Sequence, residues 1–266
     1  MSVVTSARHG AVAVIAINSP PVNALSHAVR AGISEQLAKI KAEGGAKAIV
    51  LICEGRTFGA GADITEFGKP PKAPGLSDVI AELEKSDVPT VAAIHGTALG
   101  GGLELALGCH YRVAVADAKW GLPEVKLGLL PGAGGTVRLP RAIGPVEALK
   151  VIVTGAHQPA ASGHKHGLIA EIIAGDLKTG AIAFAEKLIA KGGKHPSLRD
   201  DTSKTAHVDK AAYDAAKTEV LSKTRGLEAP VVCAQAVDNA LTMPFDAALK
   251  AERDAFMKLV DRKSVV

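Results

Sequence analysis

Short apolar runs rich in β-branched residues alternate with amphipathic helical segments along most of the chain, and this order limits the fold more than any other feature. Residues 3–7 and 11–17 are two such runs separated by His9-Gly10, which predicts a hairpin. Further apolar runs predict buried strands at residues 48–53, 90–94 and 111–115. Helical spacing predicts helices behind Ser26, at 77–85 and at 145–154. Strands that alternate with helices predict an α/β fold.

A polar segment divides the predicted elements into two groups. Residues 191–205 contain Gly192, Gly193 and Pro196, which is typical of a connection rather than of a core. Beyond it every apolar pattern has helical spacing, and the last helix is predicted to begin behind Asp246 as its N-cap. We therefore expect an α/β core at residues 1–195 and a C-terminal helical region at 206–266.

The composition excludes several classes of protein. The 266 residues are 47% hydrophobic, which is enough for a large core, and the net charge of +4 comes from scattered basic residues, so we expect no nucleic-acid partner. Cys53, Cys109 and Cys233 lie far apart, which favours core thiols in a reducing compartment. The run 11–17 is too short to span a bilayer and no signal-peptide pattern is present. We expect no membrane partner and a cytoplasmic location.

The most informative segment is 94–106, where Gly100, Gly101 and Gly102 open an apolar helix that contains Glu104. Glycines at a helix start leave backbone N–H groups accessible, and the helix N-terminus favours negative charge, so the segment predicts a site for an oxyanion. A carboxylate in an apolar run is costly unless it has a partner. A structural alternative is that Glu104 only complements the dipole of its own helix.

Two more glycine-rich segments accompany it, at 55–64 and 121–136, and the second contains another acid in an apolar context, Glu124. Neither segment is a dinucleotide fingerprint, because Ile64 and Val137 occupy the position of the third glycine. No phosphate-binding loop and no histidine spacing typical of a metal site occurs in the sequence. A Rossmann fold is therefore excluded and no metal site is expected.

Three motifs in this order resemble the crotonase superfamily, also known as the enoyl-CoA hydratase/isomerase family. They are Phe58-Gly59-Ala60-Gly61-Ala62-Asp63-Ile64, Ala98-Leu99-Gly100-Gly101-Gly102-Leu103-Glu104-Leu105-Ala106, and Pro123-Glu124 followed by Gly128 and Pro131-Gly132-Ala133-Gly134-Gly135-Thr136. The resemblance covers residues 3–190. It implies the crotonase (ClpP-like) spiral of ββα units with a C-terminal helical region. Gly59 departs from the serine or alanine of many relatives, which puts the rigidity of the loop around Ala60 in doubt.

Roles for individual residues follow from this resemblance. The backbone N–H groups of Ala60 and Gly101 match the family's oxyanion hole, and Glu104 and Glu124 match its two hydratase acids. In the family these acids flank one water; the resemblance assigns water activation chiefly to Glu104 and the C2 proton chiefly to Glu124. The positions that match the coenzyme A and substrate pocket are Ala60, Ala62, Asp63, Ile64, Gly100, Gly101, Pro123 and Gly132.

The resemblance implies an enoyl-CoA hydratase of fatty-acid β-oxidation that needs no cofactor, since the coenzyme A thioester is its substrate. Two alternatives stay open: a Δ3,Δ2-enoyl-CoA isomerase, alone or as a second activity, and a non-catalytic coenzyme A-binding protein of the same fold. Residues 224–230 and 240–245, together with Glu252-Arg253, resemble the segment that joins hydratase to 3-hydroxyacyl-CoA dehydrogenase in multifunctional enzymes. A homotrimer, a dimer of trimers and fusion to such a dehydrogenase are therefore all open.

Overall fold

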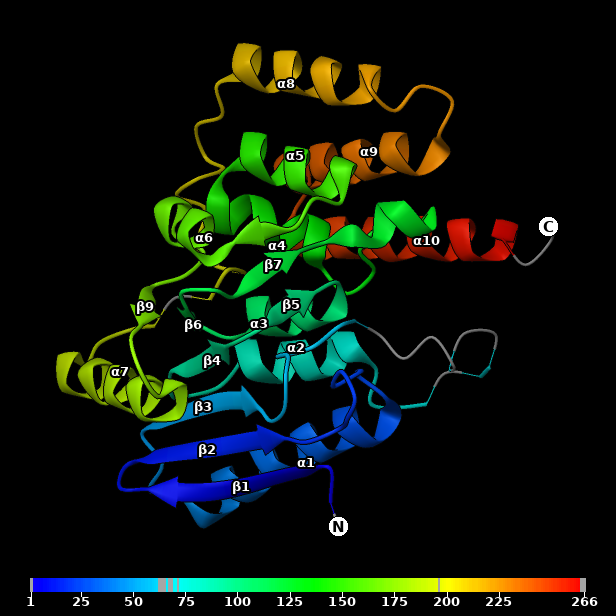
Figure 1. Ribbon diagram of the computed structural model, residues 1–266. Coiled ribbons are helices and arrows are strands. Elements are labelled where there is room, and N and C mark those ends of the chain that lie inside the picture. The colour runs from blue at the N-terminus through cyan, green and yellow to red at the C-terminus, as the bar shows by residue number, and fades with distance from the viewer. Residues whose placement is uncertain (1, 62–65, 67–68, 71, 196, 264–266) are drawn as a thin grey trace.

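A computed structural model describes residues 2–61, 66, 69–70, 72–195 and 197–263. Its main sheet has six strands in the order β1-β2-β3-β4-β6-β9 (Figure 1). The bounds are β1 Val4–His9, β2 Val12–Ile17, β3 Ala48–Cys53, β4 Thr90–Ile94, β6 Tyr111–Val115 and β9 Glu171–Ile173. A smaller sheet contains β5 Thr97–Leu99, β7 Lys119–Gly121 and β8 Gln158–Pro159.

The direction of strand pairing in the main sheet agrees with the residues of its strands. β1 and β2 pair antiparallel with Val4 opposite Ile17, which confirms the predicted hairpin, and the other neighbours pair parallel. The central strands read Ala-Ile-Val-Leu-Ile-Cys in β3 and Thr-Val-Ala-Ala-Ile in β4. Continuous apolar runs of this kind suit parallel strands that are covered on both faces.

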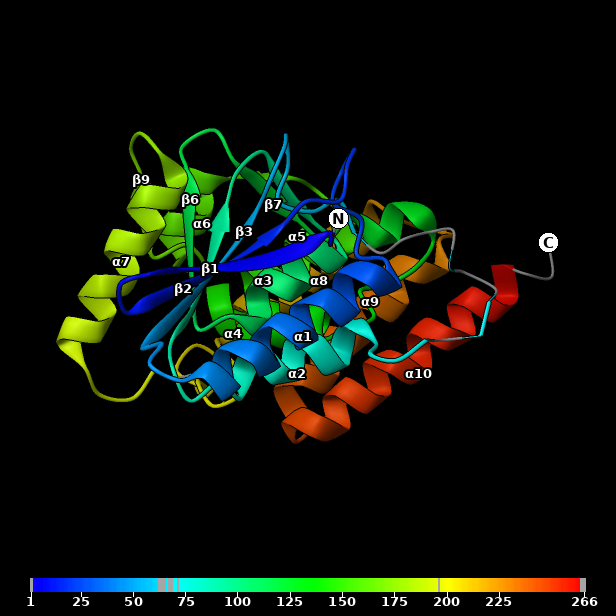
Figure 2. The ribbon, with the colours of Figure 1, turned by 90° about the horizontal axis from the view of Figure 1, so that it is seen from below.

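Helices cover those two faces (Figure 2). One side carries α1 His27–Glu43, α2 Leu76–Glu84 and α3 Gly101–Gly108, and the other carries α7 Leu177–Lys191. Side chains alternate between the sides: Val12 and Val14 pack with α7, whereas Ala13 and Ile15 lie in the larger core with α1. The period of two along a strand therefore produces two cores from one sheet.

The chain passes repeatedly from the main sheet to the small sheet and then into a helix. β4 is followed by β5 and α3, and β6 is followed by β7 and the 3-10 helix η2, Pro123–Leu127. β3 has a shorter counterpart, because Gly59 forms a parallel bridge with Ala98 before α2 begins. This repetition confirms the expected spiral of ββα units.

The remaining helices form a second layer at the end of the spiral. They are α4 Gly135–Ile143, α5 Pro145–Thr154, α6 Ala160–His166, α8 Lys210–Ser222, α9 Glu228–Thr242 and α10 Phe245–Lys263. α8 and α9 contact α5, and α9 and α10 contact α4 (Figure 1). The division into parts at 1–195 and 206–266 stays a prediction. Across the described ranges, no helix is both long and apolar enough to cross a membrane.

The start of α10 differs from the expectation. The helix begins at Phe245, so Asp246 lies in its first turn and is not the N-cap. The carboxylate of Asp246 instead accepts a hydrogen bond from the guanidinium of Arg199 at 2.8 Å. A long-range ion pair therefore satisfies this side chain, and the first turn is closed by the N–H of Ala248, which donates to the carbonyl of Pro244.

Candidate active site

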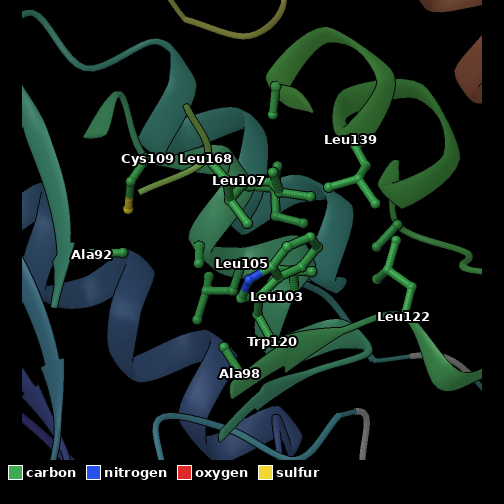
Figure 3. Close-up of a cluster of buried hydrophobic side chains, with 14 of the residues drawn as sticks. Ala92, Ala98, Leu103, Leu105, Leu107, Cys109, Trp120, Leu122, Leu139 and Leu168 are labelled. Atoms are coloured by element: carbon green, nitrogen blue, oxygen red, sulfur yellow. The ribbon is translucent and has the colours of Figure 1, made fainter. Parts of the chain in front are cut away.

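Helix α3 carries Glu104 through the centre of the apolar core. All eight residues of the helix are buried, and Glu104 is only 3% exposed. Figure 3 shows the apolar side chains around this helix, among them Leu103, Leu105 and Trp120. Trp120 is part of this core, and its indole N–H donates to the carbonyl of Pro159. Packing of this density holds the helix, and hence its acid, in one position.

The carboxylate of Glu104 is bound by the loop before α4. Its Oε1 atom accepts hydrogen bonds from the N–H groups of Ala133 at 2.8 Å and Gly135 at 2.9 Å. A Cβ atom on Gly135 would lie 2.9 Å from the same oxygen, so only glycine fits here. The alternative that Glu104 merely complements its own helix dipole does not describe these contacts, which reach a different helix.

Opposing effects act on the proton affinity of Glu104. Burial raises its pKa, whereas the hydrogen bonds from Ala133 and Gly135 and the charges of Arg138 and Arg253 lower it. The net direction of the pKa is upward. The two donated N–H groups favour the ionised form, because a carboxylate accepts where a carboxylic acid would also have to donate.

Glu124 approaches the same place from η2. A Cβ atom on Gly100 would lie 2.9 Å from Oε1 of Glu124, and Gly100 has a φ of +54°, so the glycine is required for both space and conformation. The other oxygen, Oε2, is buried and has no hydrogen-bond partner in the part of the chain that the structure describes. Burial, followed by the charge of Glu104, raises the pKa of Glu124 well above its ordinary value.

The backbone around Ala60 and Gly101 is held by the small sheet. The N–H of Gly59 donates to the carbonyl of Thr97, and the N–H of Leu99 donates to the carbonyl of Gly59. Gly59 and Leu99 are thus joined by backbone pairing, and Ala60 and Gly100 are the next residues along the two segments. Gly101 is the first residue of α3, so its N–H has no acceptor within the helix.

One of the two expected oxyanion donors is engaged. The N–H of Ala60 donates to the carbonyl of Val22 at 3.2 Å, whereas the described residues provide no acceptor for the N–H of Gly101. The Ala60 bond is at the long end of the normal range. A thioester oxygen at this site would have to share or replace Val22 as the acceptor.

Gly59, which departs from the serine or alanine of many relatives, lies in close contact with the start of α3. A Cβ atom on Gly59 would lie 3.3 Å from the Cα atom of Gly102, and one on Gly102 would lie 2.8 Å from the carbonyl carbon of Gly59. The two glycines therefore bring helix α3 and the loop before Ala60 into direct backbone contact.

Gly102→Ala is expected to displace this loop. The added methyl group meets backbone atoms that cannot rotate away, which costs about 1–3 kcal/mol of stability. The shift moves Ala60 relative to Gly101 and weakens any bond to an oxyanion. Urea unfolding measures the loss of stability, and a wild-type value would show that the contact is not needed.

The other expected pocket positions are distributed as follows. Ala62, Asp63 and Ile64 lie outside the described residues. Pro123 begins η2, one residue before Glu124. Gly132 lies against the ring of Phe256, because a Cβ atom there would be 2.7 Å from the ring. All three cysteines are buried free thiols, and the described ranges contain no cluster of acidic, histidine or cysteine side chains suited to a metal ion.

Sequence reasoning missed one member of the site, Glu252 of α10. It is 1% exposed, and its carboxylate accepts hydrogen bonds from Gly134 and Thr136 in the loop that also binds Glu104. A signal was available: Phe245, Ala248 and Leu259 lie on the buried face of α10, and Glu252 interrupts that apolar stripe at helical spacing.

Comparison with known proteins identifies a family whose model matches most of the chain. Residues 7–230 match the model of the family described as enoyl-CoA hydratase/isomerase. The peroxisomal bifunctional enzyme of Danio rerio is 42% identical over 248 residues, which are 93% of this chain and 34% of the relative. The probable enoyl-CoA hydratase of Bacillus subtilis is 43% identical over 191 residues, which are 66% of this chain and 73% of the relative. The chain thus spans about a third of the length of its multifunctional relatives.

Solved structures agree in fold. An enoyl-CoA hydratase from Mycobacterium avium superposes with a TM-score of 0.68 at 26% identity, covering 99% of this chain and all of the other. An enoyl-CoA hydratase from Bacillus anthracis gives a TM-score of 0.66 at 27% identity, covering 97% of this chain and 91% of the other. The two superpositions extend over the spiral and the C-terminal helices alike.

Proposed function

The chain belongs to the enoyl-CoA hydratase/isomerase family, and on that premise we propose that it adds water across the C2=C3 bond of trans-2-enoyl-CoA to give 3-hydroxyacyl-CoA in fatty-acid β-oxidation. One observation carries the proposal: Glu104 and Glu124 lie in the same buried place, where Glu104 accepts two N–H hydrogen bonds and Oε2 of Glu124 has no partner among the described residues. Hydration needs one group that accepts a proton from water and one that donates a proton to carbon.

Glu104 is suited to be the base. Its Oε1 atom is occupied by two N–H donors, which fixes the carboxylate and leaves Oε2 to accept a proton from water. The oxygen of that water forms the new bond to C3. Burial raises the pKa of Glu104 overall, and the two N–H donors together with the charges of Arg138 and Arg253 act against that rise.

Glu124 is suited to be the acid. Its Oε2 atom is buried and unpaired among the described residues, and burial, followed by the charge of Glu104, raises its pKa, which favours the protonated form that an acid needs. Delivery of that proton to C2 completes the addition and leaves Glu124 ionised and Glu104 protonated. Transfer of one proton from Glu104 back to Glu124, directly or through the next water, restores the starting state. Environments that separate the pKa values of two carboxyls are the usual basis for such a division of roles.

The N–H groups of Ala60 and Gly101 complete the proposed site. They would hold the thioester oxygen as negative charge develops there, an effect of about 3–4 kcal/mol for a donor in comparable sites. Ala62, Asp63, Ile64, Gly100, Pro123 and Gly132 stay proposed as lining positions for coenzyme A and substrate. No cofactor is needed, because the thioester itself supplies the electron-withdrawing group.

The assay that tests the proposal is loss of the conjugated-thioester absorbance of crotonyl-CoA on incubation with the protein. Hydration supports the proposal. Turnover of a 3-enoyl-CoA without hydration would favour an isomerase, and binding of coenzyme A esters without turnover would favour a non-catalytic protein. Either of the last two results overturns hydration as the function.

The activity should fall on the alkaline side of its pH profile. The acid must be protonated, so its contribution is present below the pKa of Glu124 and is lost as the pH rises through that value. Because that pKa is raised well above 4.5, the decline comes far above the ordinary carboxyl range. Measurement of kcat/KM between about pH 5 and about pH 10 locates it. A decline centred on the ordinary carboxyl range would contradict the role of Glu124.

The larger context of the chain is proposed on the same basis. Relatives that it matches along a third of their length are named peroxisomal bifunctional enzymes, so a joined 3-hydroxyacyl-CoA dehydrogenase partner suits a hydratase of this type. The trimeric states and the cytoplasmic location stay predictions. Sedimentation of the purified protein tests the first and imaging of a tagged chain in cells tests the second.

A further inference from the structure

The inner face of α10 covers the glycine loop at residues 132–136. A Cβ atom on Gly132 would meet the ring of Phe256 at 2.7 Å, and one on Gly134 would meet Leu249 at 3.0 Å. Glu252 lies between these two side chains along the helix. The spacing of three and then four residues places all three on one helix face. The C-terminal helix therefore contacts the loop that binds Glu104.

Glu252 is tied to this loop by three short hydrogen bonds. Its Oε1 accepts from the N–H of Gly134 at 2.6 Å, and its Oε2 accepts from the N–H and the hydroxyl of Thr136 at 2.8 and 2.6 Å. Every one of these partners donates. An ionised carboxylate can accept all three bonds, whereas a glutamine would have to place its own donor against one of them.

The two glutamates divide the backbone donors of the loop in strict alternation. Glu104 binds the N–H groups of Ala133 and Gly135, and Glu252 binds those of Gly134 and Thr136. Alternate N–H groups in this loop therefore reach carboxylates on two different helices, so the bonds to Glu252 set the direction of those that reach Glu104.

We propose that Glu252 is a positioning residue of the hydration reaction, which anchors the loop at residues 133–136 so that its remaining N–H groups orient the Glu104 base. The inference rests on the proposed function, and it assigns a part of the active site to the C-terminal helix. Glu252 is not placed in contact with substrate. It acts through the loop and through its charge.

Other charged and titratable groups face this cluster from each neighbouring element. They are Glu104 of α3, Glu124 of η2, Arg138 of α4, Cys233 of α9 and Arg253 of α10. Burial and the charge of Glu104 raise the pKa of Glu252 to about 8, against the effect of its hydrogen bonds. The charge of Glu252 in turn helps to raise the pKa of Glu124.

Glu252→Gln tests the positioning role in the 266-residue chain with crotonyl-CoA. We expect kcat to fall about tenfold while KM changes little, because the glutamine NH₂ group then faces a donor of the loop, whereas the substrate loses no contact. The alkaline decline of kcat should also move to lower pH. A neighbouring negative charge raises the pKa of Glu124, so its removal lowers that pKa.

Two further variants make the result specific. Asp254→Asn changes a carboxylate to an amide on the same helix, where Asp254 pairs with exposed Lys250, and wild-type kinetics are expected. Thr136→Val removes the hydroxyl that binds Glu252 and keeps the shape, so kcat should fall less but with unchanged KM. If circular dichroism shows that Glu252→Gln is unfolded, Thr136→Val decides: a wild-type kcat overturns the inference.

A second readout does not need turnover. In protein with ¹³C-labelled glutamate carboxyls, the signal of Glu124, assigned by its loss in Glu124→Gln, should titrate at lower pH in Glu252→Gln than in wild type. If wild type fails to hydrate crotonyl-CoA but this shift is seen, the proposed function fails and the coupling holds. If wild type hydrates and the Glu252→Gln variant has wild-type kcat, pH profile and titration, the inference fails alone.

Discussion

Glu124→Gln is expected to hydrate crotonyl-CoA about a hundredfold more slowly than wild type, or slower still. Glutamine has nearly the shape of glutamate but cannot release a proton to C2, and a positioned acid or base contributes about 10²- to 10⁴-fold. The unpaired Oε2 of Glu124 makes this change mild for folding, because no hydrogen bond from the described residues is lost there. Initial rates at saturating substrate measure the effect.

Glu104→Gln should be impaired to a similar degree for a different reason. The amide oxygen can still accept from Ala133 and Gly135, but the free end then carries an NH₂ group that cannot take a proton from water. Glu219→Gln is the matched control, because Glu219 is exposed and pairs with Lys223, the residue that follows its helix α8. Activity within a few-fold of wild type in either active-site variant would remove that residue from the mechanism.

Arg138→Met is expected to lower the free energy of unfolding by about 3 kcal/mol, because the buried carboxylate of Glu84 loses its main partner and keeps only the longer ion pair with Arg199 at 3.5 Å. The guanidinium donates to both oxygens of Glu84 at 2.8 and 2.9 Å, and the two side chains are 3% and 1% exposed. Urea unfolding followed by circular dichroism measures the change.

A matched pair separates this effect from simple loss of a cation. Lys41→Met removes a charge whose partner, Asp87, is largely exposed, so a change of less than about 1 kcal/mol is expected. Addition of Glu84→Leu to Arg138→Met should recover much of the stability, because the buried carboxylate that had lost its main partner is then gone from the core. A double variant no more stable than the single one would show that packing, rather than the stranded carboxylate, dominates.

Local sequence patterns were sufficient to predict most of the helices and the longer strands. The apolar runs at β4 and β6 were predicted with the bounds that the structure has, because each is a buried strand with turn residues on both sides. The predicted bounds of α5 also agree, since Gly144 and Gly155 flank it and both adopt positive φ. The small sheet was not predicted, because strands of two or three residues are too short to show an alternation of apolar and polar residues.

The candidate site was predictable only where motifs carry it. Glu104 and Glu124 stand in apolar segments next to glycines, and the structure brings both into one buried place. Glu252 lies 118 residues from its partner Gly134, and no local pattern reports a contact across that distance. The bond between Ala60 and Val22 was equally out of reach, because it depends on how two loops meet.

The backbone pairing between Gly59 and Ala98 has a consequence for how a site of the proposed kind can diversify. The spacing between the amides of Ala60 and Gly101 is set by main-chain pairing and by the contact between Gly59 and Gly102, so side chains elsewhere in the pocket can change without altering it directly. Selection can therefore reshape the walls around a substrate without retuning the groups that stabilise its reactive oxygen. Tolerance of sequence change and constancy of chemistry would then arise from the same few peptide bonds.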